Sequence, residues 1–156
     1  MKNRTTYPSR MAHIKFDATH ILVFLNEEKA KHKPVSPGTE GETPEIDGYA
    51  YAQPDWYAGP ETDGAVMIEA QEFTKDGIVP GLIHAHPEYA GDGENKIHSL
   101  ALKLQITTDQ TEREAITQQL QAFDAHRTWA YETAEELLAR TCLLYTSPSP
   151  RDPKTS

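Results

Sequence analysis

A regular apolar pattern near the end of this chain limits its possible folds more than any other feature. Between residues 109 and 140, apolar side chains recur in alternating steps of four and three, the period of one helix face. The pattern predicts a long amphipathic helix from about Asp109 to Arg140, with Asp109 and Glu112 as a capping pair. The seam of this helix consists of Ile116, Leu120, Phe123, Arg127, Ala130, Ala134 and Leu137.

A shorter helix is expected just before the long one, from about Asn95. Its apolar stripe is out of phase with the seam by two residues, which favours two helices that turn near residues 107–109. A stutter inside one continuous helix gives the same pattern, so that alternative stays open. The stripe consists of Ile97, Leu100, Ala101 and Leu104.

The first half of the chain has strand patterns instead. Apolar and polar residues alternate at 14–16, and residues 21–25 are continuously apolar, which indicates one bent strand or a tight pair. Residues 49–51 predict a short strand with one aromatic face, and residues 64–72 predict the central strand. The sequence therefore predicts an α+β fold: a small N-terminal β-sheet of three to four short strands, followed by a C-terminal helical hairpin or long amphipathic helix.

Between these elements the composition indicates irregular segments. Residues 1–10 are polar without periodicity and are interpreted as a disordered leader. A β-rich part then covers residues 11–94 and contains a mobile loop at 27–47, rich in Pro, Gly and charge. A helical part covers residues 95–141. Residues 74–86 have apolar residues at helical spacing, but Gly77, Pro80 and Gly81 oppose a helix, so a turn and a short apolar segment are favoured over a helix there.

The last residues form a separate case. Residues 142–152, CLLYTSPSPRD, resemble the translation of a sequencing adapter, the mosaic end and primer site of transposon-based libraries. We therefore interpret residues 142–156 as a non-native, artefactual tail and expect it to be disordered or to pack against nothing. The given sequence is then truncated at about Thr141, and we expect the natural protein to continue beyond that residue. The chain's one cysteine, Cys142, falls in this tail, so no thiolate chemistry is expected.

Charge and hydropathy exclude two classes of partner. The formal net charge is −9, and no Lys/Arg stripe interrupts the acidity, so we expect no nucleic-acid partner. No apolar run approaches the roughly 18 residues that a membrane span needs, so no membrane partner is expected. These features together lead us to expect a soluble, intracellular protein.

His84-Ala85-His86-Pro87 is the one short pattern with chemical meaning. On an extended segment, residues two apart point to the same side, so His84 and His86 could bind one zinc ion. The pattern resembles the signature of JAB/MPN-type zinc isopeptidases, which implies a zinc-dependent hydrolase. The Ser and Asp that follow in that family have no match here, because Ser99 has Leu102 three positions on. The opposing interpretation makes both histidines ordinary polar residues.

A broader resemblance covers residues 12–140. The segments from Asp63 to Ala70 and from Phe123 to Arg127 are similar to segments of short phage- or prophage-encoded proteins, often found near virion and tail-fibre assembly genes. The resemblance implies a place in the cytoplasm of a bacterial host or in a virion, and it brings no catalytic residue with it. We therefore expect a non-enzymatic, cofactor-free binding or assembly factor, with the zinc hydrolase as its alternative.

The lengths of the two helices suggest where a partner binds. At 1.5 Å per residue the long helix spans about 48 Å and the shorter one about 20 Å. The shorter helix therefore covers less than half of the longer one, which leaves Ala130, Ala134 and Leu137 for a protein partner or a second copy. The alternatives are that the strands cover this end, or that truncation removed its cover.

Overall fold

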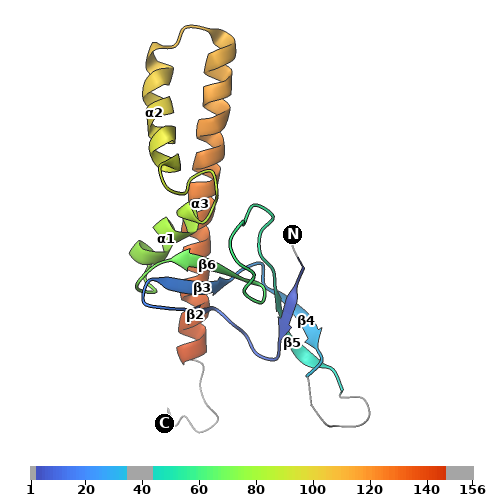
Figure 1. Ribbon diagram of the computed structural model, residues 1–156. Helices are drawn as coiled ribbons and strands as arrows, with labels where there is room; N and C mark the ends of the chain where they lie inside the picture. The colour runs from blue at the N-terminus through green and yellow to red at the C-terminus, as the bar shows by residue number, and fades with distance from the viewer. Residues whose placement is uncertain (1–2, 35–43, 147–156) are drawn as a thin grey trace.

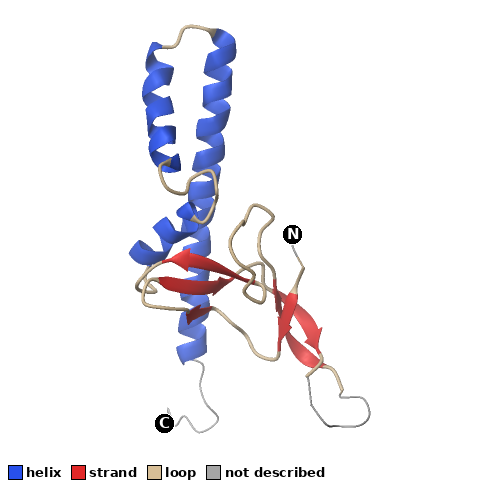
Figure 2. Cartoon of the chain, in the orientation of Figure 1, coloured by secondary structure: helices blue, strands red, loops and turns tan. Residues whose placement is uncertain are grey.

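The computed structural model describes residues 3–34 and 44–146 of the chain. It confirms the α+β class, because short antiparallel strands at the N-terminal side precede a long C-terminal helix (Figures 1 and 2). In chain order the elements are β1 (Thr5–Tyr7), β2 (His13–Lys15), β3 (His20–Phe24), β4 (Glu28–His32), β5 (Ile46–Tyr51), β6 (Ala65–Glu69), α1 (Lys75–His84), α2 (Gly93–Ile106) and α3 (Gln110–Thr146).

The strands form two antiparallel sheets of three strands each, in the orders β1-β5-β4 and β2-β3-β6. The segments at 14–16 and 21–25 are a tight pair, since Ile14 lies opposite Leu22. The central strand of the second sheet is β3, and β6 lies at an edge of that sheet, so the prediction of a central strand at 64–72 is wrong. β3 also pairs with β6 along its whole length, from His20–Glu69 to Phe24–Ala65.

Two segments expected to lack structure contain strands. In the expected disordered leader, β1 pairs with β5, placing Thr5 opposite Tyr51. In the expected mobile loop at 27–47, β4 pairs with the other side of β5, and Lys31 forms an ion pair with Asp47. Strand pairing supplies backbone hydrogen bonds that a polar composition does not reveal. The rest of that loop, residues 35–43, lies outside the described residues.

Residues 75–84 form the helix α1, so the prediction of a turn there is wrong. Thr74 caps the helix by accepting a hydrogen bond from the amide of Gly77 at 3.2 Å. Packing outweighs the poor helix propensity of Pro80 and Gly81, because Ile78 and Leu82 are fully buried against the second sheet. Gly81 permits this approach, since a Cβ atom there would lie 2.8 Å from the carbonyl oxygen of Glu69.

The main core lies between the second sheet, α1 and the C-terminal part of α3, which crosses the sheet in Figure 1. Ala130, Ala134 and Leu137 are fully buried in this core. The expectation that they face a partner is therefore wrong, and the alternative in which the strands cover this end is confirmed. A smaller core joins the two sheets around Phe24, Tyr51 and Ala65.

The buried face of α3 also departs from the predicted seam at one position. Arg127 is exposed, and His126, the residue before it, is buried with 9% of its surface accessible. The predicted turn near residues 107–109 is confirmed, because α2 ends at Ile106 and α3 begins at Gln110. α3 continues to Thr146, beyond the predicted end at Arg140, while Leu143 and Leu144 are exposed. The adapter origin of this tail stays a prediction.

Candidate functional site

α2 and the first half of α3 run side by side away from the sheets (Figure 1). We call residues 93–124 the helical arm. Within α2, Gly93 alone is buried, and the side chains that face α3 are half-buried or exposed. On the α3 side, Ile116 and Phe123 are buried and Leu120 is half-buried. The arm therefore has a thin apolar interior, because two helices alone cannot enclose their facing side chains.

Two large apolar side chains near the end of the arm face away from α3. Leu102 is 68% exposed and Ile106 is 82% exposed. At about 100° per residue, both lie about 160° around the helix axis from Leu104, which faces α3. We call Leu102 and Ile106 the tip patch. An exposed apolar group at the end of a projecting helix is a typical feature of a protein-binding surface.

Hydrogen bonds fix the helix connection beside the tip patch. Arg113 donates through Nη1 to the carbonyl oxygens of Leu104 and Thr107, at 2.7 and 2.8 Å. These bonds satisfy acceptors that the C-terminal end of α2 would otherwise leave without partners. Asp109 accepts from the amide of Glu112 at 2.8 Å, as the predicted capping pair requires, and Lys103 forms an ion pair with Glu112. The tip patch is thus held on a preorganised turn.

Where the arm joins the sheets, six aromatic and imidazole rings gather. We call this group the junction cluster; it consists of Trp56, His86, Tyr89, Phe123, His126 and Trp129. The rings come from the loop after β5, the segment after α1, and the middle of α3. The rings of His126 and Trp129 stack with centroids 5.1 Å apart, and those of His86 and Trp56 stack at 5.2 Å. The cluster ties three separate segments together.

The two imidazoles of the junction cluster contact each other, with ring centroids 4.8 Å apart. Burial lowers the pKa of His126, and the neighbouring His86 lowers it further, against hydrogen bonds to the backbone at Leu82 and Ile83. Burial likewise lowers the pKa of His86, against the carboxylate of Glu88. Both histidines are therefore neutral near pH 7.

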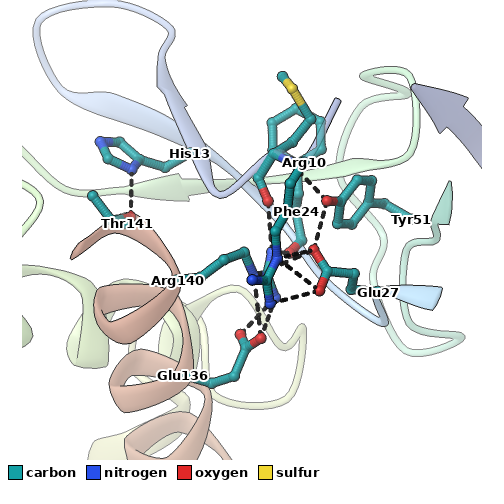
Figure 3. Close-up of polar contacts among 9 residues, drawn as sticks. Arg10, His13, Phe24, Glu27, Tyr51, Glu136, Arg140 and Thr141 are labelled. Carbon is teal, nitrogen blue, oxygen red and sulfur yellow. Dashed lines mark hydrogen bonds and ion pairs between the residues drawn. The ribbon is translucent and has the colours of Figure 1, made fainter. Parts of the chain in front are cut away.

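A buried arginine fixes α3 to both sheets, as Figure 3 shows. Arg140, 3% exposed, donates to the carbonyl oxygens of Met11 and Phe24 at 2.8 and 2.7 Å and pairs with Glu136. Glu27 lies 3.5 Å from the guanidinium, and it also accepts from Arg10 and Tyr51. Burial alone would raise the pKa of Glu27, but the hydrogen bonds from Arg10 and Tyr51 and the charge of Arg140 lower it overall.

The structure separates the two histidines predicted to share a metal. His84 lies in the last turn of α1, so the assumption of an extended segment is wrong. Its Nε2 atom lies 2.8 Å from Glu94, whereas His86 stacks on Trp56. Within residues 3–34 and 44–146, no group of three or more His, Cys, Asp or Glu side chains is placed to hold a metal ion. His84 does share a surface hollow of about 310 Å³ with Glu69.

Sequence reasoning found most of the buried face of α3 but missed His126, Trp129 and Arg140. Strict alternation of four-residue and three-residue steps leads from Phe123 to Arg127. A three-residue step from Phe123 would have led to His126 instead. The two tryptophans of the chain could have pointed to Trp129, because large aromatic side chains tend to pack together and Trp56 and Trp129 do so in the junction cluster. The contacts of Arg140 join distant segments and leave no local pattern.

Comparison with known proteins gives no relative: we found no family model, curated protein or solved structure that matches the chain. Among the described residues, no helix combines the length and the apolarity that crossing a bilayer requires.

Proposed function

We propose that this chain is a non-enzymatic binding protein that assembles with a protein partner through the tip patch of its helical arm. The observation that carries the proposal is the exposure of Leu102 and Ile106 on a projecting helix whose turn is held by Arg113. A rigid surface loses little conformational entropy on binding, which favours association. We extend the proposal to a phage-encoded assembly factor because residues 63–70 and 123–127 resemble such proteins.

The partner that we propose is a second copy of the chain. The arm holds five acidic and three basic residues, so it carries −2 of the formal −9 and repels a second arm only moderately. Two arms that bring their tip patches together would cover Leu102 and Ile106 in one four-helix contact. The same surface would accept an apolar helix of another protein, which is the other outcome of the test.

Sedimentation equilibrium from low to high micromolar concentration tests the proposal. The unmodified protein is expected to show a concentration-dependent dimer, and Leu102→Glu and Ile106→Glu are expected to weaken it at least tenfold. Gln105→Glu is the matched control, because it adds the same charge between these positions without removing apolar surface. All three residues are exposed, so the melting temperature is expected to stay unchanged. A strictly monomeric protein, unaffected by these variants, would contradict the second copy as the partner.

The zinc-hydrolase alternative is tested separately by elemental analysis of the purified protein. The binding proposal predicts no stoichiometric zinc. Zinc at one equivalent that is lost in His84→Ala would overturn the binding proposal in favour of the hydrolase. Because His84 is exposed, this variant is expected to fold, so loss of zinc would not reflect unfolding.

A further inference from the structure

The junction cluster joins three segments through rings that contact one another. Trp56 anchors the loop after β5, His86 and Tyr89 anchor the segment after α1, and His126 and Trp129 belong to α3. His126 is central, since its ring lies within 5.4 Å, between centroids, of the rings of Trp56, His86, Tyr89 and Trp129. Any change in His126 therefore reaches all three segments at once.

The hydrogen bonds of the two imidazoles require a neutral ring at His86 and a proton on Nε2 at His126. The amide of Glu88 donates to Nδ1 of His86 at 3.1 Å, so that nitrogen must be unprotonated. A proton on Nδ1 would face this amide hydrogen and break the bond. Nε2 of His126 lies 3.2 Å from the carbonyl oxygen of Leu82, which requires the proton on Nε2. A second proton on His126 would then place a charge among aromatic rings.

The charged groups around the cluster compensate such a charge poorly. In the segment after α1, the carboxylate of Glu88 favours a charged His86, but Glu88 is exposed and its charge is screened by solvent. Burial raises the pKa of Tyr89 in the same segment, so Tyr89 carries no charge between pH 5 and 7.5. From α2, His98 lies at the edge of Phe123. Beside the cluster in sequence, Asp55, Asp124 and Arg127 are all exposed. Two charged imidazoles 4.8 Å apart would moreover repel each other.

We propose that the junction cluster is an acid-sensitive latch, which holds the Trp56 loop and the end of α1 on α3 and opens when His86 and His126 are protonated. Opening releases the Trp56 loop and the segment after α1 from α3, while the Arg140 network still holds the C-terminal part of that helix. The function of the latch is thus to make the attachment of the Trp56 loop and of the end of α1 to α3 depend on pH. It does not depend on which partner the tip patch binds.

The direction of the pH dependence follows from the two neutral histidines. Their pKa values are lower in the folded than in the unfolded chain, so the unfolded or opened form binds protons more readily. Stability from the latch is therefore fully present above the ordinary histidine pKa of about 6.5 and is lost as the pH falls below it. The carboxylate of Glu27, whose pKa is lowered, contributes separately and only at more acid pH.

Intrinsic fluorescence tests the latch directly, because both tryptophans of the chain lie in the cluster. Between pH 7.5 and 5, we expect the emission of the full chain to move to longer wavelength, with a midpoint below pH 6.5 and with far-ultraviolet circular dichroism unchanged. The variant His86→Gln is expected to shift this midpoint by at least half a pH unit or to remove the transition. His98→Gln, at an exposed imidazole on α2, is the control and is expected to behave like the unmodified protein.

Two results would overturn the latch. One is emission that stays constant across this pH range, and the other is an identical transition in the double variant His86→Gln/His126→Gln. If replacing the buried His126 prevents folding, NMR titration of its imidazole in the unmodified protein gives the answer. A midpoint below 6.5 that coincides with the fluorescence change supports the latch, and a midpoint above 6.5 overturns it.

Discussion

The guanidinium of Arg140 satisfies acceptors from two distant parts of the chain and one acceptor on its own helix. Met11 and the Phe24–Glu27 segment lie more than a hundred residues away in sequence, and Glu136 lies one helical turn away on α3. A buried charge is costly to desolvate, but once its hydrogen-bond and ion-pair partners are in place it fixes the segments that carry them relative to one another. Arg140 thereby fixes the position of α3 relative to both sheets, and with it the direction of the helical arm.

Removing this side chain is expected to destabilise the fold strongly. Arg140→Ala leaves the carbonyl oxygens of Met11 and Phe24 without this donor and removes the positive charge beside Glu27, which keeps its bonds from Arg10 and Tyr51. The expected cost is about 3–5 kcal/mol in the free energy of unfolding. Arg127→Ala is the matched control, since Arg127 is exposed on the same helix, and it is expected to cost less than about 0.5 kcal/mol. Urea denaturation followed by circular dichroism gives both values. Equal costs for the two variants would refute the role of Arg140.

At the scale of elements, α3 is one continuous helix in two environments. Its C-terminal part is buried in the main core at Ala130, Ala134 and Leu137, and its first part is covered only by α2. The periodicity of the seam predicted both helices and the turn, because helix faces are encoded locally. It could not predict which surface covers the seam, because the covering residues come from β3, β6 and α1.

Elements that carry a local sequence pattern could be predicted, and elements stabilised by contacts between distant segments could not. The apolar run at 21–25 indicated a buried strand, since burial on both faces leaves a continuous signal. β1 and β4 were missed because they are short, polar, and stabilised by pairing with β5. α1 was missed because Pro80 and Gly81 count against a helix locally, whereas the contact of Gly81 with β6 is visible only in three dimensions.

The two environments of α3 predict two levels of local stability. Amide hydrogen exchange at low micromolar concentration is expected to be slow at residues 126–137. In the arm, at residues 113–120, it should be at least about tenfold faster, a difference of about 1.4 kcal/mol in opening free energy. The reason is the number of buried apolar contacts that must separate before each part can open. Uniform protection along the whole of α3 would refute this division.

At the scale of the whole molecule, the protein consists of a body and a projecting arm. The body contains the two sheets, α1 and the C-terminal part of α3, and the arm carries the tip patch outward (Figure 1). A partner on the helical part stays a proposal, but the proposed binding surface lies on α2 and not at the C-terminal end of α3. The patch proposed now is Leu102 and Ile106, because the positions first expected to be open are buried.

Hydrogen exchange compared at two protein concentrations tests this location most directly. Raising the concentration from low to high micromolar is expected to slow exchange at residues 98–106 of α2 and to leave residues 126–137 of α3 unchanged. Such a pattern would place the second copy on the tip patch. Exchange that is identical at both concentrations, or protection that appears on the sheets instead of α2, would contradict the proposal that the helical arm is the assembly surface.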